Sequence, residues 1–210
     1  MGYGGSEPSE EVLGMIAGIL SDLTTICEPE YGYTVYEGTR SGTELVRIAD
    51  SDLTTGPVIA SCFRDAEYVA AFVATIGEGF DLYSKRLQNQ GDMARAFLAD
   101  SIGSVLAEGC VALMINALEK DMNTRGLQIS NNYSPGYCGW PLVEQGILFS
   151  HMVDGTSCNV KLTPSFLMIP IKSVSGIIGA SENMKKRAYG CDICTMTTCI
   201  KYRKRREAGA

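Results

Sequence analysis

The chain has 210 residues, of which 45% are hydrophobic and 20% are charged. These proportions are typical of a globular domain and exclude an intrinsically disordered chain. The formal net charge of -6 argues against a nucleic-acid partner, because phosphate binding requires a basic surface. No run approaches the roughly 20 apolar residues of a membrane span, and no basic segment opens a signal sequence. We therefore expect a cytoplasmic protein that does not contact a membrane.

The first third of the chain predicts one helix and two strands. Residues 9–26 carry apolar residues at helical spacing, and Ser9 is a suitable N-cap. Residues 31–37 are aromatic and β-branched, which indicates a strand. Residues 69–76 form a continuous apolar run closed by Gly77, which favours a buried strand.

Helical patterns dominate the middle of the chain. Residues 80–122 form a long helical tract with a predicted break near Asn89–Gly91, and a second helix is predicted over residues 141–152. Between them, residues 131–141 contain two prolines and two glycines, so we predict an irregular segment.

Two short strands, 166–169 and 174–178, are predicted on either side of Pro170. Strands that helices separate unevenly predict an α+β domain with a mixed or antiparallel twisted sheet and flanking helices. We expect a single domain over residues 1–184 and a basic, cysteine-rich tail over residues 185–210.

Eight cysteines without a signal sequence indicate reduced thiols or metal ligands rather than disulfides. Cys191, Cys194 and Cys199 follow a C-x2-C-x4-C pattern, which suits zinc or an iron–sulfur cluster, with Cys138 or Cys158 as a candidate fourth ligand. Basic residues on both sides of this run would lower the pKa of its thiols. The alternative is a solvated tail whose cysteines bind nothing.

The most distinctive segment is Tyr133-Ser134-Pro135-Gly136-Tyr137. Glycine lets a backbone amide approach a ligand closely, proline stiffens the segment, and tyrosine offers a flat face with a hydroxyl group. The same residues are also compatible with a buried turn. Trp140 next to Pro141 is interpreted as a packing anchor.

Four ordered blocks of the sequence resemble the activation domain of cobalamin-dependent methionine synthase, over residues 66–180. The loop at 132–137 is similar to the Arg-x-x-x-Gly-Tyr signature that binds S-adenosylmethionine in this family. Residues 67–77 resemble the strand before its long helices, and residues 98–108 resemble the helix that carries its acidic ligand contact. Residues 162–176 resemble its closing pair of strands.

The resemblance implies a domain that reactivates an accidentally oxidised corrinoid. In this family a one-electron donor reduces the cobalt and bound S-adenosylmethionine remethylates it, so the domain positions a ligand and supplies no acid or base. The resemblance assigns ligand contacts to Glu108, Asn132, Ser134, Pro135, Gly136 and Tyr137. The chain has no Asp-x-His-x-x-Gly segment, so cobalamin is expected on a partner, either a corrinoid-binding protein or a methyltransferase. An electron-donor protein is a further expected partner.

One position departs from the signature, because Asn132 stands where the family has arginine. An amide cannot form the charged, bidentate clamp on a carboxylate that a guanidinium forms. The alternative is therefore a docking or redox module for a corrinoid protein, with a cysteine-ligated metal and no S-adenosylmethionine site. His151 is the only histidine in the chain, and no catalytic triad or other catalytic residue is predicted.

Overall fold

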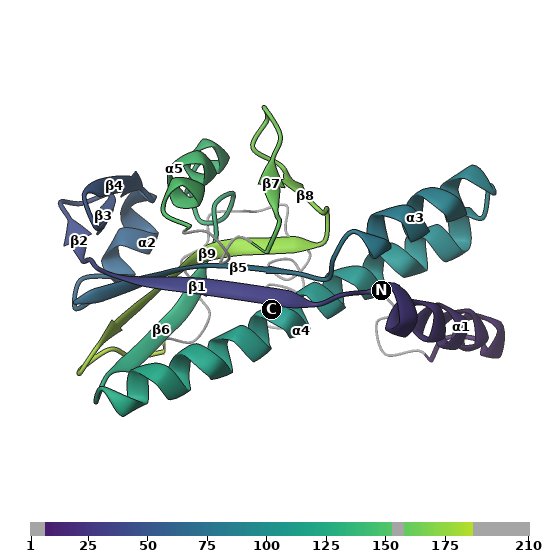
Figure 1. The fold of residues 1–210 in the computed structure, drawn as a ribbon, viewed down its shortest axis with the longest axis horizontal. Helices are drawn as coiled ribbons and strands as arrows, with labels where there is room; N and C mark the ends of the chain where they lie inside the picture. The colour runs from purple at the N-terminus through teal and green to yellow at the C-terminus, as the bar shows by residue number, and fades with distance from the viewer. Residues whose placement is uncertain (1–6, 153–157, 187–210) are drawn as a thin grey trace, which may run out of the picture. The chain divides into compact units, whose positions relative to one another are not determined.

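The computed structural model describes residues 7–152 and 158–186, and its largest sheet has four strands in the order β1-β5-β9-β6 (Figure 1). These strands are β1 (Glu30–Glu37), β5 (Tyr68–Thr75), β9 (Ser173–Ser181) and β6 (Gln128–Tyr133). Strands β6 and β9 pair antiparallel. In β5 every residue after Tyr68 is buried, which explains the continuous apolar run in its sequence.

The described residues form two compact units. Among the described residues, the first unit comprises 7–32, 73–116 and 158–174, and the second comprises 33–72, 117–152 and 175–186. The predicted α+β class with antiparallel pairing is confirmed. The predicted boundary after residue 184 stays a prediction, because the cysteine-rich tail lies outside the described residues.

Helices α1 (Glu10–Ile26), α3 (Gly79–Asn89) and α4 (Met93–Thr124) supply the core of the first unit. The Ser9 side chain accepts a hydrogen bond from Val12 N, as an N-cap should. The predicted break between the long helices is confirmed at Gly91, whose φ is 73°. Asp92 Oδ1 then accepts from Arg95 N at 3.0 Å, which caps the first turn of α4.

Helix α4 is long and apolar enough to cross a membrane, judged by length and composition alone. Its most apolar 18-residue window has a mean hydropathy of 1.6, and 44% of that window is buried. No span was predicted, because no run in the sequence approaches roughly 20 consecutive apolar residues. Since Leu98, Ala99 and Ile102 belong to the core of the first unit, we interpret α4 as a core helix.

The second unit contains elements that the sequence analysis did not predict. They are β2 (Arg40–Ser41), β3 (Leu45–Ile48), β4 (Ser51–Thr54) and α2 (Gly56–Cys62). The three strands form an antiparallel sheet. Strands of two to four residues carry too little period-2 pattern to be recognised, and tertiary contacts with the core stabilise them instead.

Three predicted boundaries are corrected by the structure. Residues 131–133 belong to β6 rather than to the irregular segment, and β9 is longer than the predicted 174–178. The predicted helix at 141–152 divides into a 3-10 turn η1 (Leu142–Glu144) and the short helix α5 (Gln145–Ser150). In each case the strand pairing or the turn depends on partners distant in the sequence, which local patterns do not contain.

Candidate functional site

One exposed face of α4 in the first unit carries the acidic residue that the resemblance selects. Asp100, Ser104 and Glu108 follow one another at i, i+4 spacing, and all three are exposed. Residues at this spacing lie on the same side of a helix. We call these three residues the acidic α4 face. Its carboxylates can accept hydrogen bonds from an ammonium group of a ligand.

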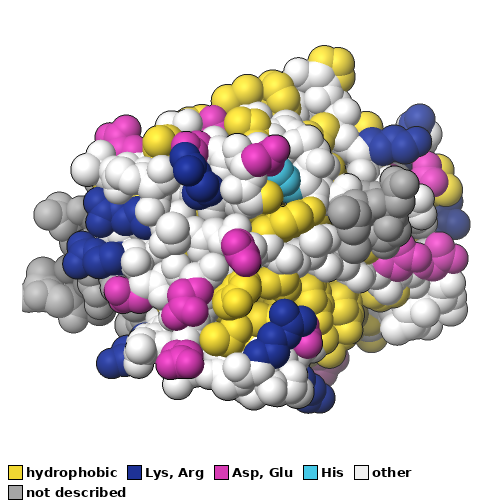
Figure 2. Space-filling model, turned by 60° about the vertical axis from the view of Figure 1, so that its left-hand side comes forward, with side chains coloured by type: hydrophobic (Ala, Val, Ile, Leu, Met, Phe, Trp, Pro, Cys, Tyr) yellow, Lys and Arg dark blue, Asp and Glu magenta, His cyan; other side chains and the backbone are white. Residues whose placement is uncertain are grey.

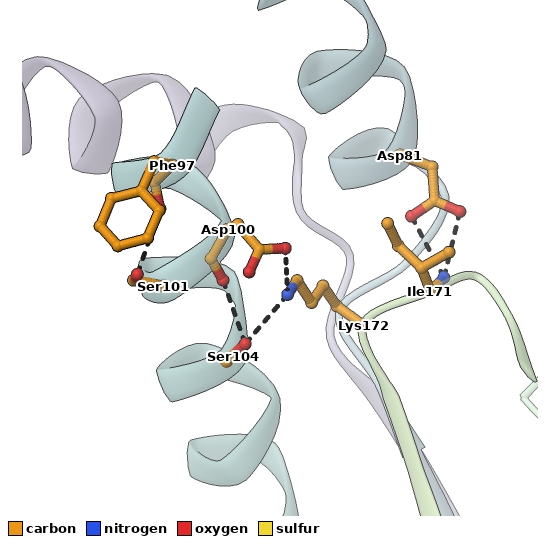
Figure 3. Close-up of polar contacts among 7 residues, drawn as sticks. All are labelled: Asp81, Phe97, Asp100, Ser101, Ser104, Ile171 and Lys172. Atoms are coloured by element: carbon orange, nitrogen blue, oxygen red, sulfur yellow. Dashed lines mark hydrogen bonds and ion pairs between the residues drawn. The ribbon is translucent and has the colours of Figure 1, made fainter. Parts of the chain in front are cut away.

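A largely buried lysine contacts the acidic α4 face (Figure 3). Lys172 Nζ lies 2.6 Å from Asp100 Oδ1 and donates to Ser104 Oγ at 2.9 Å. The Lys172 side chain is 12% exposed, whereas that of Asp100 is 62% exposed. The ammonium also lies 5.5 Å from the centroid of the Phe80 ring, within cation–π range. Sequence reasoning missed Lys172, because it belongs to no motif and its partners lie far away in the chain.

Asp81 of α3 holds the residue before Lys172. The Ile171 N–H donates to both Asp81 carboxylate oxygens, at 3.2 and 3.1 Å (Figure 3). Burial raises the pKa of Asp81 above its ordinary value, and the negative charge of Glu78 adds to this increase. The hydrogen bond from Ile171 and the charge of Lys172 oppose the increase without cancelling it. Asp81 therefore holds a proton more tightly than an exposed aspartate does.

Strand β5 and the turn after it hold the same segment. Ser173 Oγ donates to Pro170 O at 2.7 Å and lies 2.8 Å from Thr75 Oγ1. The Ile76 N–H donates to Lys172 O at 3.1 Å. Residues 170–173 are therefore tied to α3, α4 and the end of β5.

The segment leads out of a small hairpin formed by β7 (Lys161–Leu162) and β8 (Met168–Ile169). Leu167, Ile169 and Ile171 are 57%, 48% and 55% exposed. They lie in β8 or close to its ends, so the three exposed side chains are close together in the chain. These three residues, which we call the apolar edge, thus place exposed side chains next to a polar network that holds the backbone.

The second unit contains the loop that resembles the family signature, and backbone contacts hold it in shape. The Gly136 N–H donates to Trp140 O at 2.8 Å, and the Trp140 N–H donates to Tyr137 O at 2.9 Å. Gly136 and Gly139 have φ values of 90° and 85°, which other residues rarely adopt. A Cβ atom at Gly139 would meet no atom within 4 Å, and Tyr137 is 59% exposed. The loop therefore presents a glycine backbone and an aromatic ring to solvent.

A β-bulge precedes the loop. The pairing of β6 with β9 shifts register between Ile129 and Asn132, so Asn132 pairs with Ile178. The Ser130 hydroxyl bridges the gap, since it accepts from Gly179 N at 2.9 Å and donates to Asn131 O at 2.7 Å. Bulges often redirect side chains next to functional sites. The structure thus places Asn132 at the end of a strand, directly before the loop.

Trp140 anchors the loop, as the sequence predicted. It is 1% exposed and belongs to the core of the second unit, together with Phe63 and Leu148. Pro135 is also buried, whereas Gly136 and Tyr137 are exposed. The loop is therefore neither a wholly buried turn nor a wholly solvated one.

The predicted site residues fall into two groups. Asn132, Ser134, Pro135, Gly136 and Tyr137 are consecutive or nearly so in the second unit, and the loop contacts hold them together. Glu108 belongs to the first unit, so its surroundings are those of the acidic α4 face.

The predicted metal ligands Cys191, Cys194 and Cys199 lie outside the described residues. Within residues 7–152 and 158–186, no group of three or more His, Cys, Asp and Glu side chains could hold a metal ion. No disulfide joins the cysteines in that part of the chain. Burial raises the pKa of the Cys27 and Cys110 thiols, and it raises the pKa of Cys158 to about 11, with smaller contributions from the charges of Glu30 and Cys110. These thiols are therefore largely protonated near neutral pH when no metal is bound, and they are weak nucleophiles, because the thiolate is the reactive form.

Charge on the face in Figure 2 is mixed. Lys and Arg side chains are scattered among Asp and Glu, and a hydrophobic area lies between them. This face has no continuous basic surface that would favour nucleic acid.

Comparisons with known proteins point in one direction. A family model described as "Vitamin B12 dependent methionine synthase, activation domain" matches residues 58–207. Among solved structures, the chain is similar to the one described as "Crystal Structure of the MetH Reactivation Domain bound to AdoHcy", with a TM-score of 0.63 and 17% identity. That similarity covers 95% of this chain and 72% of that chain, and at this identity it supports the fold alone. No curated protein matches the chain.

Proposed function

Because the family model matches more than half of the chain, the chain belongs to the vitamin B12 dependent methionine synthase activation domain family. We propose that it binds S-adenosylmethionine and so reactivates a corrinoid-dependent methyltransferase. The corrinoid would be carried by a partner protein. This protein would act as an accessory factor, with an external electron donor.

The observation that carries the proposal is the conformation of the loop at Ser134–Tyr137. Gly136 in this loop and Gly139 just after it have positive φ values and are exposed, and Tyr137 is exposed although Trp140 and Pro135 are buried. A rigid loop with an exposed ring suits a flat, polar ligand such as the adenosyl group, because little conformational freedom is lost on binding. The similar solved structure, that of the MetH reactivation domain, contains bound AdoHcy, which is the demethylated form of the proposed ligand.

The residues of this chain would bind and orient the ligand. The Tyr137 ring would stack on the adenosyl group, and exposed backbone groups of the loop would bind its polar atoms. Glu108 would accept hydrogen bonds from the ligand ammonium, as the resemblance implies. When bound, S-adenosylmethionine supplies the methyl group that passes from sulfur to cobalt on the partner.

The apolar edge supports a corrinoid partner. Exposed apolar side chains grouped in one place commonly mark an interaction site, and the face of a corrin ring is largely apolar. The edge also lies within the family match, next to the closing strand β9.

Calorimetric titration of the anaerobically purified protein with S-adenosylmethionine tests the proposal. We expect micromolar binding that Tyr137→Ala and Glu108→Ala each weaken about ten-fold. Tyr31→Ala is the matched control, because Tyr31 is also exposed, at 42%, and belongs to no candidate site. The absence of heat up to millimolar ligand would exclude the methyl-donor role.

A second candidate function rests on Asn132. A docking or redox module would need no charged clamp for a ligand carboxylate, and it would use Cys191, Cys194 and Cys199 to hold zinc or an iron–sulfur cluster that relays electrons. Metal, iron and sulfide assays on anaerobic protein test this function. Values near zero would exclude it.

A further inference from the structure

We propose that Lys172 is a positioning residue, which fixes the apolar edge in the arrangement that docks on a corrinoid. The inference rests on the proposed function, because it names how the docking surface of that function is held. Lys172 itself is largely buried and would not touch the partner.

Several contacts converge on four consecutive residues at one end of the apolar edge. Asp81 binds the Ile171 N–H, the Ile76 N–H binds Lys172 O, and Ser173 Oγ binds Pro170 O. Lys172 Nζ adds the contact with the α4 helix, through Asp100 and Ser104 (Figure 3). The backbone contacts fix the path of the chain, and the lysine side chain ties it to α4.

Stability does not explain a charge at this position. A largely buried ammonium loses hydration and rotamer freedom, and its partner Asp100 is mostly solvated, so the pair adds little to the free energy of unfolding. A methionine would pack against the Phe80 ring as well as the lysine stem does. The ammonium instead fixes where the segment lies along α4, because its two acceptors, Asp100 and Ser104, lie one helical turn apart.

The variant Lys172→Met tests the placement of residues 170–173 without changing the stability of the fold. It leaves no buried polar atom without a partner, because Asp100 is exposed and the Ser104 hydroxyl donates to Asp100 O at 3.0 Å. The melting temperature should therefore stay close to that of the wild type. Lys161→Met is the matched control, since Lys161 is an exposed lysine in β7 of the hairpin that precedes Lys172. Asp100→Asn should reproduce the effect of Lys172→Met, and the double variant should add nothing further.

Two measurements on the whole chain test the inference. The first is amide hydrogen exchange at Ile171 and Ile76, which should become about ten-fold faster in Lys172→Met and unchanged in Lys161→Met. The second is equilibrium dialysis with hydroxocobalamin as the probe, where Lys172→Met should bind about ten-fold more weakly and Lys172→Arg should recover most of the loss.

The outcomes separate this inference from the proposed function. Unchanged exchange in Lys172→Met overturns the positioning role, and so does faster exchange with unchanged cobalamin binding. If the wild type does not bind hydroxocobalamin, the docking role of the apolar edge is overturned. The titration with S-adenosylmethionine decides the ligand part of the proposed function independently of both results.

Discussion

The two candidate regions of the molecule are held in shape by different means. In the first unit, most of the contacts that hold residues 170–173 involve side chains, chiefly the carboxylates of Asp81 and Asp100, and one backbone hydrogen bond from Ile76 adds to them. In the second unit, backbone hydrogen bonds and glycine conformations hold the loop, with Trp140 as its anchor. A side-chain network responds to pH and to single polar substitutions, whereas a backbone loop responds to changes in its glycines and its anchor. The comparison predicts which substitutions each region tolerates.

The largest effect is expected at the anchor of the loop. Trp140→Ala should lower the free energy of unfolding by about 3–5 kcal/mol, because a fully buried aromatic side chain leaves a cavity in the core. Tyr137→Ala should change it by less than about 0.5 kcal/mol, because the ring is mostly exposed. Urea unfolding measures both values. Equal losses for the two variants would mean that Tyr137 also supports the fold.

The charge missing from the loop can be restored. Asn132→Arg should strengthen S-adenosylmethionine binding roughly ten- to a hundred-fold, since a charged hydrogen bond contributes about 1.5–3 kcal/mol. Calorimetry of this variant alongside Asn131→Arg, one residue earlier in the bulge, measures the gain. If neither variant gains affinity, the loop holds its ligand without a clamp on the carboxylate.

Two glycines of α4 compare a packed face of this helix with a face open to solvent. A Cβ at Gly103 would lie 2.4 Å from Phe80 Cε2, whereas a Cβ at Gly109 would meet no atom within 4 Å. Gly103→Ala should therefore destabilise the fold by about 1–3 kcal/mol, and Gly109→Ala should stabilise it by about 0.5–1 kcal/mol. Thermal unfolding measures both. A destabilising Gly109→Ala would contradict the open face.

The smallest effect concerns pH. A raised pKa means that the folded state favours protonated Asp81, so the stability it contributes is complete at low pH and is lost as pH rises through the raised value. Asp81→Asn keeps an acceptor for the Ile171 N–H and carries no charge. Its stability relative to the wild type should increase between about pH 4 and about pH 7, by less than about 1 kcal/mol. Urea unfolding across this range tests the sign, and a decrease would contradict it.

The local structure around the candidate site residues could be predicted from the sequence because its signals are local, whereas their contacts with a ligand stay a prediction. The Ser134–Tyr137 loop contains its own glycine and proline, and Glu108 lies on a helix whose period is evident. The bulge at Ser130 was not predictable, since it depends on how β6 pairs with β9. Lys172 was missed for a similar reason, because nothing near it in the chain indicates Asp100 as its partner.

The sequence by itself determined the long helices, the buried strand β5, the α+β class and the family resemblance. In these elements each residue's preference agrees with its neighbours, so a window of ten to twenty residues contains the signal. Only the tertiary structure decided the short strands β2 to β4, the register of β6 and the contacts that hold residues 170–173. Those features are stabilised by residues far away in the chain, so a local stretch of sequence does not contain the information that predicts them.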